Sequence, residues 1–122
     1  MTRREEEIFN AVRNELLDEI IPINYQGGKI NHPMYGHCHH AALSMYILLG
    51  GKEKGYKLQK ADDTDGIIHY WLINKDNEII DPTKEQYTDL NRELPYNRKK
   101  DNRASYRQTK AVKHILNKIN QG

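Results

Sequence analysis

The 122-residue sequence is poor in cysteine, in proline and in every aromatic residue except tyrosine. Its single cysteine, Cys38, cannot form a disulfide within the chain. No apolar run approaches the roughly 18 residues needed to span a bilayer, and the opening residues, MTRREEEIF, lack the apolar core of a signal peptide. We therefore expect a cytoplasmic protein with no membrane contact, in a compartment that keeps thiols reduced.

The sequence also lacks a large net charge, because 19 basic and 17 acidic side chains leave a formal charge of +2. The two signs are unevenly distributed: residues 1–91 carry 10 basic and 15 acidic side chains, and residues 92–122 carry 9 basic and 2 acidic ones. A basic segment of this kind can bind nucleic acid or an acidic protein. Because it has no aromatic ladder and no nucleic-acid motif, we interpret it as a solvated surface, with nucleic-acid binding as the alternative.

The length and composition predict one domain over residues 1–122, with a functional core at 36–87 and a basic loop and helix at 91–122. Hydrophobic periodicity then predicts the order of elements. We expect a helix over 3–20, a buried helix over 37–49, strands at 55–61, 67–73 and 78–81, a turn or short helical piece at 81–87, a surface loop at 91–106 and a terminal helix over 107–121. Helices combined with antiparallel strands make the expected fold class α+β.

Cys38 stands in the stretch YGHCHHAALSMYILLGG, at the first turn of the predicted buried helix. Unpaired backbone N–H groups and the positive end of the helix dipole favour the thiolate at this position. A thiolate is a nucleophile, and a nucleophile in an enzyme needs a base and a group that orients the base.

His69 and Asp81 are the predicted base and orienting group, and whether they meet depends on one hairpin. If residues 75–77 form a three-residue loop with Asn77 in the left-handed conformation, Asp81 pairs with Trp71 and lies on the same face as His69. The two backbones are then roughly 7–8 Å apart, a distance that polar side chains bridge. A two-residue loop would place His69 and Asp81 on opposite faces. The proposed chemistry therefore predicts a loop with an odd number of residues.

In this arrangement Cys38 attacks, His69 transfers the proton and Asp81 holds the imidazole. The backbone N–H of Cys38 is one predicted oxyanion donor. The second donor is left open among three side chains of the preceding segment, His37, His32 and Asn31. Trp71 is predicted either to line the cleft or to pack in the core.

A cysteine at the start of a buried helix, followed by GIIHYWLI and EIIDPT, resembles the core of papain-like and transglutaminase-like cysteine enzymes, including the small YunG-like proteins. The block GHCHHAALSMYILLGGK with HYWLINKDNEIIDPTKEQY also resembles short proteins encoded by phages. The resemblance covers residues 36–87 and implies a papain-like fold, no cofactor, and an enzyme that hydrolyses or transfers an amide-linked acyl group of a protein or peptide. It implies that Cys38, His69 and Asp81 are nucleophile, base and orienter. Where YunG-like proteins have glutamine before the cysteine, this chain has His37.

Two other interpretations stay open. Histidines flank Cys38, and any of them could bind zinc, as could Cys38, His69 and Asp81 together. No CxxC or HExxH motif completes a metal set, so we predict no metal site. Alternatively, each residue could be structural, since a lone buried cysteine is common, and the chain could be a binding protein on the same scaffold.

Overall fold

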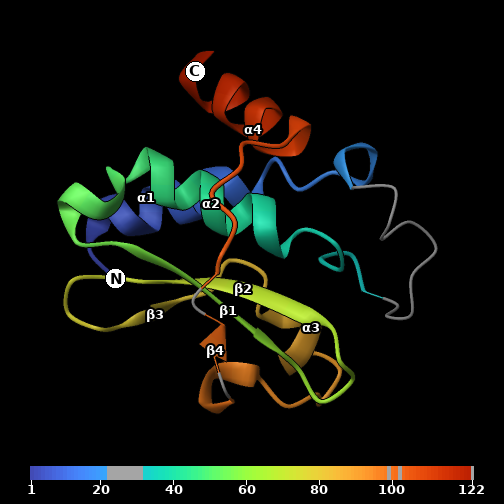
Figure 1. The fold of residues 1–122 in the computed structure, drawn as a ribbon. Helices are drawn as coiled ribbons and strands as arrows, with labels where there is room; N and C mark the ends of the chain where they lie inside the picture. Colours follow the sequence, from blue (N-terminus) through green and yellow to red (C-terminus); the bar gives the residue numbers. More distant parts are fainter. Residues whose placement is uncertain (22–31, 99, 102, 122) are drawn as a thin grey trace.

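The computed structural model describes residues 1–21, 32–98, 100–101 and 103–121, and it has an α+β fold, as predicted (Figure 1). Its helices are α1 (Arg3–Arg13), α2 (Cys38–Leu48), α3 (Glu85–Thr88) and α4 (Lys110–Gln121). Its strands are β1 (Lys57–Asp62), β2 (Ile68–Ile73), β3 (Ile79–Ile80) and β4 (Lys100–Asp101). The short 3₁₀ segments are η1 (Asp18–Ile20), η3 (Gly51–Lys54) and η4 (Pro95–Asn97).

The first helix is shorter than the sequence predicts. Thr2 caps α1 through a reciprocal capping box with Glu5, which satisfies the first free N–H groups. The helix ends at Arg13, with Asn14 at its C-cap, so the prediction of one helix over 3–20 is wrong. Asparagine is a weak helix former, and the apolar positions beyond it contact the core through loop and η1 instead.

The second helix, α2, is the buried helix that the sequence predicts. It is apolar on more than one side, and consecutive residues from His40 to Met45 are buried. It ends before Gly50, whose φ of 102° is a conformation that glycine adopts without a steric penalty. It packs against β2, α1 and α4, so Cys38 at its start is held by the most restrained helix of the fold.

The strands form an antiparallel sheet in the order β3-β2-β1-β4. Lys75, Asp76 and Asn77 form the loop between β2 and β3, and Asn77 has a φ of 63°. Asn74 N–H donates to the carbonyl of Glu78 at 3.0 Å, and Leu72 pairs with Ile80. The predicted three-residue loop and its register are therefore confirmed.

The sheet has a different environment on each side. Leu58, Tyr70, Leu72 and Ile80 belong to the apolar core that includes residues of α1, α2 and α4. Because side chains alternate along a strand, His69 and Trp71 point to the opposite side, where α3 and η4 lie (Figure 1). Polar and aromatic side chains are buried together on that second side.

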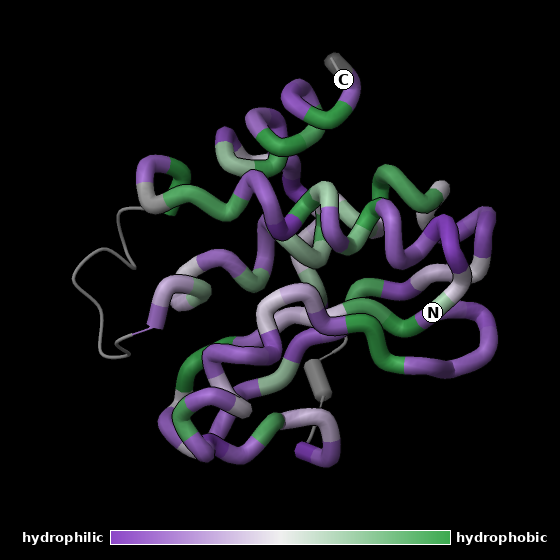
Figure 2. The backbone as a smooth tube through the Cα atoms, turned by 180° about the vertical axis from the view of Figure 1, so that it is seen from behind, coloured by the Kyte–Doolittle hydropathy of each residue, from purple (hydrophilic) through white to green (hydrophobic). Residues whose placement is uncertain are grey.

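The segment predicted as a surface loop, 91–106, contains structure that sequence periodicity does not reveal. It forms η4 and then β4, which pairs antiparallel with β1. A terminal helix is present as predicted, but α4 begins at Lys110 and not at residue 107. Hydrophilic and hydrophobic stretches alternate along it (Figure 2), and Ala111, Val112 and Ile115 are buried. Among the described residues, no helix combines the length and apolar character needed to cross a membrane.

Candidate active site

The geometric centre of the site is the pair His69–Asp81, brought together by the β2–β3 hairpin. His69 is the second residue of β2, and Asp81 directly follows β3. His69 Nε2 lies 2.6 Å from Asp81 Oδ2, and the two side chains are 0% and 1% exposed. A hydrogen bond this short between two buried groups fixes the plane and the tautomer of the imidazole.

Asp81 is itself held by other groups. The Tyr96 hydroxyl donates to Asp81 Oδ2 at 2.6 Å, and the Thr83 N–H donates to Asp81 Oδ1 at 3.1 Å. Burial and then the nearby carboxylate raise the pKa of Tyr96 well above its ordinary value, so its proton stays available for donation. The sequence analysis missed Tyr96, because it approaches from a loop 15 residues away in the chain.

Cys38 lies beside the start of β2. Its thiol donates to the carbonyl oxygen of Ile68 at 3.8 Å, and it is close enough to His69 to affect the pKa of the imidazole. Burial lowers the pKa of His69, but the charge and hydrogen bond of Asp81, together with Cys38, outweigh burial and raise that pKa to about 9. The raised pKa favours the protonated imidazole, whose Nε2 faces the carboxylate.

A pocket of about 320 Å³ opens at Cys38. Its lining includes Gly36, Cys38, His39, His40, Ile68, Tyr70, Ser105, Arg107 and Thr109. Cys38 is 7% exposed, whereas His69 is fully buried, and neither His69 nor Asp81 lines the pocket. A molecule entering the pocket therefore meets the sulfur first, and the imidazole and carboxylate lie behind it.

Two residues of α3 surround the imidazole, and sequence analysis did not single them out. Gln86 Nε2 lies 3.5 Å from His69 Nδ1 and 3.3 Å from Thr83 Oγ1. The ring of Tyr87 meets the imidazole edge to face, with centroids 4.7 Å apart. The spacing T-x-x-Q from Thr83 to Gln86 is a signal for a helix start, although it says nothing of what the helix faces.

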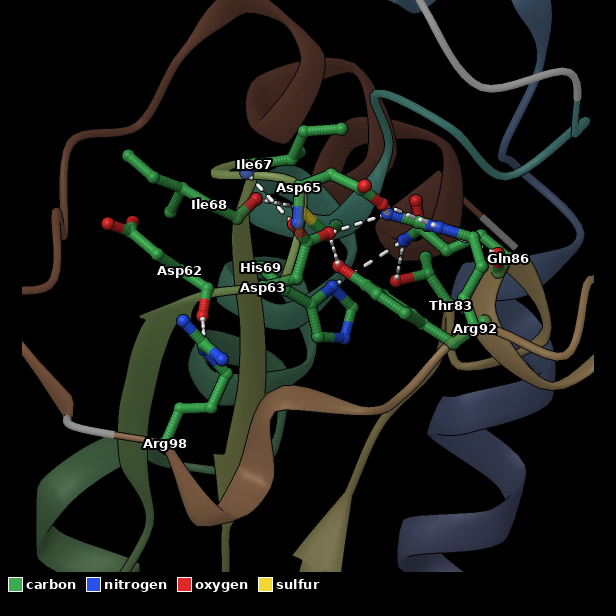
Figure 3. Close-up of polar contacts among 12 residues, drawn as sticks. Asp62, Asp63, Asp65, Ile67, Ile68, His69, Thr83, Gln86, Arg92 and Arg98 are labelled. Carbon is green, nitrogen blue, oxygen red and sulfur yellow. Dashed lines mark hydrogen bonds and ion pairs between the residues drawn. The ribbon is translucent and has the colours of Figure 1, made fainter.

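The buried carboxylate of Asp63 is the centre of a hydrogen-bond network beside His69 (Figure 3). Asp63 Oδ2 accepts from the Tyr87 hydroxyl at 2.8 Å and from Arg92 Nη2 at 2.7 Å, and its Oδ1 accepts two backbone N–H groups of the following turn. Burial would raise the pKa of Asp63, but these hydrogen bonds and the Arg92 charge hold it below its ordinary value. The network fixes Tyr87, and Tyr87 in turn contacts His69.

The remaining predicted residues lie away from the pocket or outside the described chain. His37 is fully buried, with Nδ1 2.6 Å from His40 Nε2. His32 uses both nitrogens, since Nε2 pairs with Asp89 Oδ2 at 2.9 Å and Nδ1 accepts from the Met34 N–H at 3.1 Å. Trp71 is fully buried, 5.9 Å from the His69 ring between centroids. Asn31 lies outside the described residues. His37, His32 and Trp71 are not among the residues that line the Cys38 pocket.

Within the described ranges, no three histidine, cysteine, aspartate or glutamate side chains are grouped as they would be around a metal ion. The arrangement holds an imidazole against a carboxylate and places a thiol nearby, and these are the groups used for nucleophilic acyl transfer. Comparisons of the chain with protein-family models, with curated proteins and with solved structures found no match in any of the three.

Proposed function

We propose that this protein is a cysteine hydrolase or acyl transferase that acts on an amide bond of a protein or peptide. Cys38 is the nucleophile, His69 transfers the proton and Asp81 orients the imidazole. The observation that carries the proposal is that the fully buried His69 holds Asp81 at 2.6 Å, while Cys38, hydrogen-bonded to the carbonyl of the neighbouring Ile68, is close enough to raise the pKa of the same imidazole.

The fold supports the same assignment. A cysteine begins a buried helix, and the helix packs on an antiparallel sheet that carries the histidine and the carboxylate. That order resembles papain-like and transglutaminase-like enzymes, and we propose a papain-like fold on this basis. The phage proteins that the sequence resembles suggest a host protein as the target.

The reaction is balanced with water as the only co-reactant. The Cys38 thiolate forms a C–S bond to the amide carbon, and the carbonyl electron pair moves to oxygen. As the carbonyl re-forms, the C–N bond breaks and the leaving nitrogen takes a proton from His69. Water then gives a proton to His69 and its oxygen bonds to the same carbon, so the C–S bond breaks and the acid leaves. An amine in place of water gives acyl transfer.

The start of α2 supplies one donor for the oxyanion. The N–H of Cys38 is the first of the helix and has no acceptor within it. A backbone donor at a helix start needs no reorganisation when negative charge develops on the carbonyl oxygen. Neither His37 nor His32 lines the pocket, and we propose no second side-chain donor from the preceding segment.

The test is the pH dependence of Cys38 alkylation by iodoacetamide, measured by mass spectrometry on the intact chain. An ordinary thiol reacts roughly 75-fold faster at pH 8 than at pH 6, following its thiolate fraction. We expect the wild-type ratio to stay below about 5, because the imidazolium of His69 stabilises the thiolate. The His69→Gln variant should regain the steep dependence, and His114→Gln, a change in α4, should not.

A second measurement tests acyl transfer itself. With p-nitrophenyl acetate, the wild type should release about one equivalent of nitrophenolate per chain in a burst, followed by slower turnover. Cys38→Ala should show no burst, and Asp81→Asn a slower one. Ordinary thiol behaviour in the alkylation series, or a burst that survives Cys38→Ala, would contradict the proposed function.

A further inference from the structure

One chain segment, residues 103–109, here called the strap, contributes Ser105, Arg107 and Thr109 to the lining of the pocket at Cys38. His39 Nε2 lies 2.9 Å from the carbonyl oxygen of Ser105, and the Ser105 N–H donates to the Tyr70 hydroxyl at 3.3 Å. The Thr109 hydroxyl accepts from the Val112 N–H at 3.3 Å and so begins α4. In Figure 1 the strap runs from the sheet past α2 to α4. It is therefore fixed at its middle and at its end beside the nucleophile.

The strap places an unneutralised cation in the pocket. Arg107 lines the pocket, and no aspartate or glutamate is among the described residues that line it. The Arg107 guanidinium forms no ion pair within the part of the chain that the structure describes. By contrast, Arg92 and Arg13 are paired with carboxylates at 2.7 Å and 2.9 Å.

Apart from Arg107, no lysine, arginine, aspartate or glutamate is among the described residues that line the pocket. Lys60 Nζ lies 5.9 Å from the centre of the Tyr70 ring, which also lines the pocket. Burial, and then the Lys60 charge, lower the pKa of His39, and burial lowers the pKa of His40 to about 3. Both histidines are therefore neutral at neutral pH, and Arg107 is the cationic side chain among the described residues that line the pocket, none of which is an aspartate or glutamate.

We infer that Arg107 binds a carboxylate of the substrate, so that the amide attacked by Cys38 lies close to a negatively charged group. Guanidinium and carboxylate match as a planar, two-pronged pair. In a peptide the carboxylate is either the terminal one or the side chain of aspartate or glutamate. This inference rests on the proposed function, because it assumes that Cys38 is the attacking atom.

The test compares two alkylating reagents that differ only in charge. Iodoacetate and iodoacetamide both react by the same step, in which the Cys38 thiolate forms a C–S bond and iodide leaves. The quantity measured is the rate with iodoacetate divided by the rate with iodoacetamide, at pH 7 and low salt. Arg107→Gln should lower this ratio roughly five-fold, the size expected of an exposed ion pair.

The matched control is Arg3→Gln, which removes the same charge from an arginine whose side chain is 94% exposed at the start of α1. It should leave the ratio at the wild-type value, and added salt should lower the ratio of the wild type but not that of Arg107→Gln. An equal ratio in wild type and Arg107→Gln would overturn the carboxylate inference and leave the proposed function standing. A thiol inert to both reagents would overturn both.

Two further pairs of reagents distinguish the source of the carboxylate. N-iodoacetyl-glycine and its amide differ in a terminal carboxylate, and N-iodoacetyl-aspartyl amide and its asparaginyl counterpart differ in a side-chain carboxylate. The pair whose rate ratio falls in Arg107→Gln identifies the group that the pocket binds. If neither ratio changes, the carboxylate inference is wrong for peptide-like substrates.

Discussion

Asp81 Oδ2 accepts two hydrogen bonds of equal length, 2.6 Å from His69 and 2.6 Å from Tyr96. A single carboxylate oxygen is thus shared between the imidazole and a phenol. Hydrogen bonds to an ionised acceptor withdraw charge from it, so Tyr96 weakens the attraction between Asp81 and protonated His69. Tyr96 is a positioning residue for Asp81, and it also sets how strongly the imidazole holds its proton.

Replacing Tyr96 with phenylalanine removes that competing donor and leaves the ring. We expect the pKa of His69 to rise further above about 9, because the carboxylate charge is then directed at the imidazole alone. The free energy of unfolding should fall by about 1.5–3 kcal/mol, the loss typical of a hydrogen bond to a charged group. An NMR titration of the imidazole and a urea unfolding curve measure the two quantities.

Tyr106→Phe is the control, since Tyr106 is 49% exposed and lies on the strap away from Asp81. It should change neither the His69 pKa nor the stability by more than about 0.5 kcal/mol. A His69 pKa that falls in Tyr96→Phe would mean that the phenol supports the ion pair instead of competing with it.

At the scale of elements, the register of the β2–β3 hairpin determines whether His69 and Asp81 lie on the same face of the sheet. Asn74 Oδ1 accepts from the N–H groups of Asp76 and Glu78 at 3.0 Å and 2.9 Å, and Asn77 completes the loop with a positive φ. One residue fewer would turn Asp81 to the other face of the sheet. The local chemistry of two asparagines therefore determines whether His69 has a carboxylate.

Asn77→Val should destabilise the protein by about 1–2 kcal/mol, because a β-branched side chain is strained in the left-handed region. Asn77→Gly should stay within about 0.5 kcal/mol of the wild type, since glycine adopts this φ freely but loses more chain entropy on folding. Thermal unfolding of both variants measures the difference. Equal stabilities would show that the left-handed conformation at Asn77 does not hold the hairpin.

The same hairpin shows how much could be predicted from the sequence. The pairing of His69 with Asp81 followed from alternation along a strand and from the tolerance of asparagine for positive φ, both of which are local. The buried helix followed from apolar residues on more than one of its sides. The end of α1 could not be predicted from periodicity. Leu16 and Ile20 continue the spacing of a helix, but they pack on the core from a loop and from η1.

The contacts that surround the site could not be predicted. Tyr96 and Gln86 reach Asp81 and His69 from segments whose position depends on tertiary packing, and nothing in their sequence neighbourhood shows what they face. The place of Arg107 in the pocket could not be predicted either, because it depends on the strap lying beside α2. Sequence patterns predict faces of elements, whereas contacts between loops need coordinates.

For the whole molecule, two buried histidines with opposite pKa shifts set the pH range of stability. Folding raises the pKa of His69 from 6.5 to about 9, so its contribution is complete below pH 6.5 and is lost as the pH rises through 9. Burial, with the charges of His37 and His39, lowers the pKa of His40 to about 3. Folding therefore favours its neutral form, and stability is lost as the pH falls from 6.5 towards 3.

We accordingly expect the free energy of unfolding to be highest near pH 6.5 and to decline on both sides, as measured by urea unfolding between pH 5 and pH 9.5. Asp81→Asn should flatten the alkaline side, because His69 then has no carboxylate to hold its proton. His40→Gln should reduce the decline towards pH 5. A wild-type curve that rises from pH 6.5 to pH 9 would contradict the raised pKa of His69.

The separation of the three site residues along the chain has a consequence for how the protein acquires its chemistry. His69 and Asp81 are 12 positions apart within one hairpin, whereas Cys38 is 30 positions from the strand that it contacts. Contacts between near neighbours close faster than distant ones. A newly synthesised chain should therefore pair His69 with Asp81 early and bring Cys38 to them only when α2 docks, so the proposed catalytic site is incomplete in partly folded molecules.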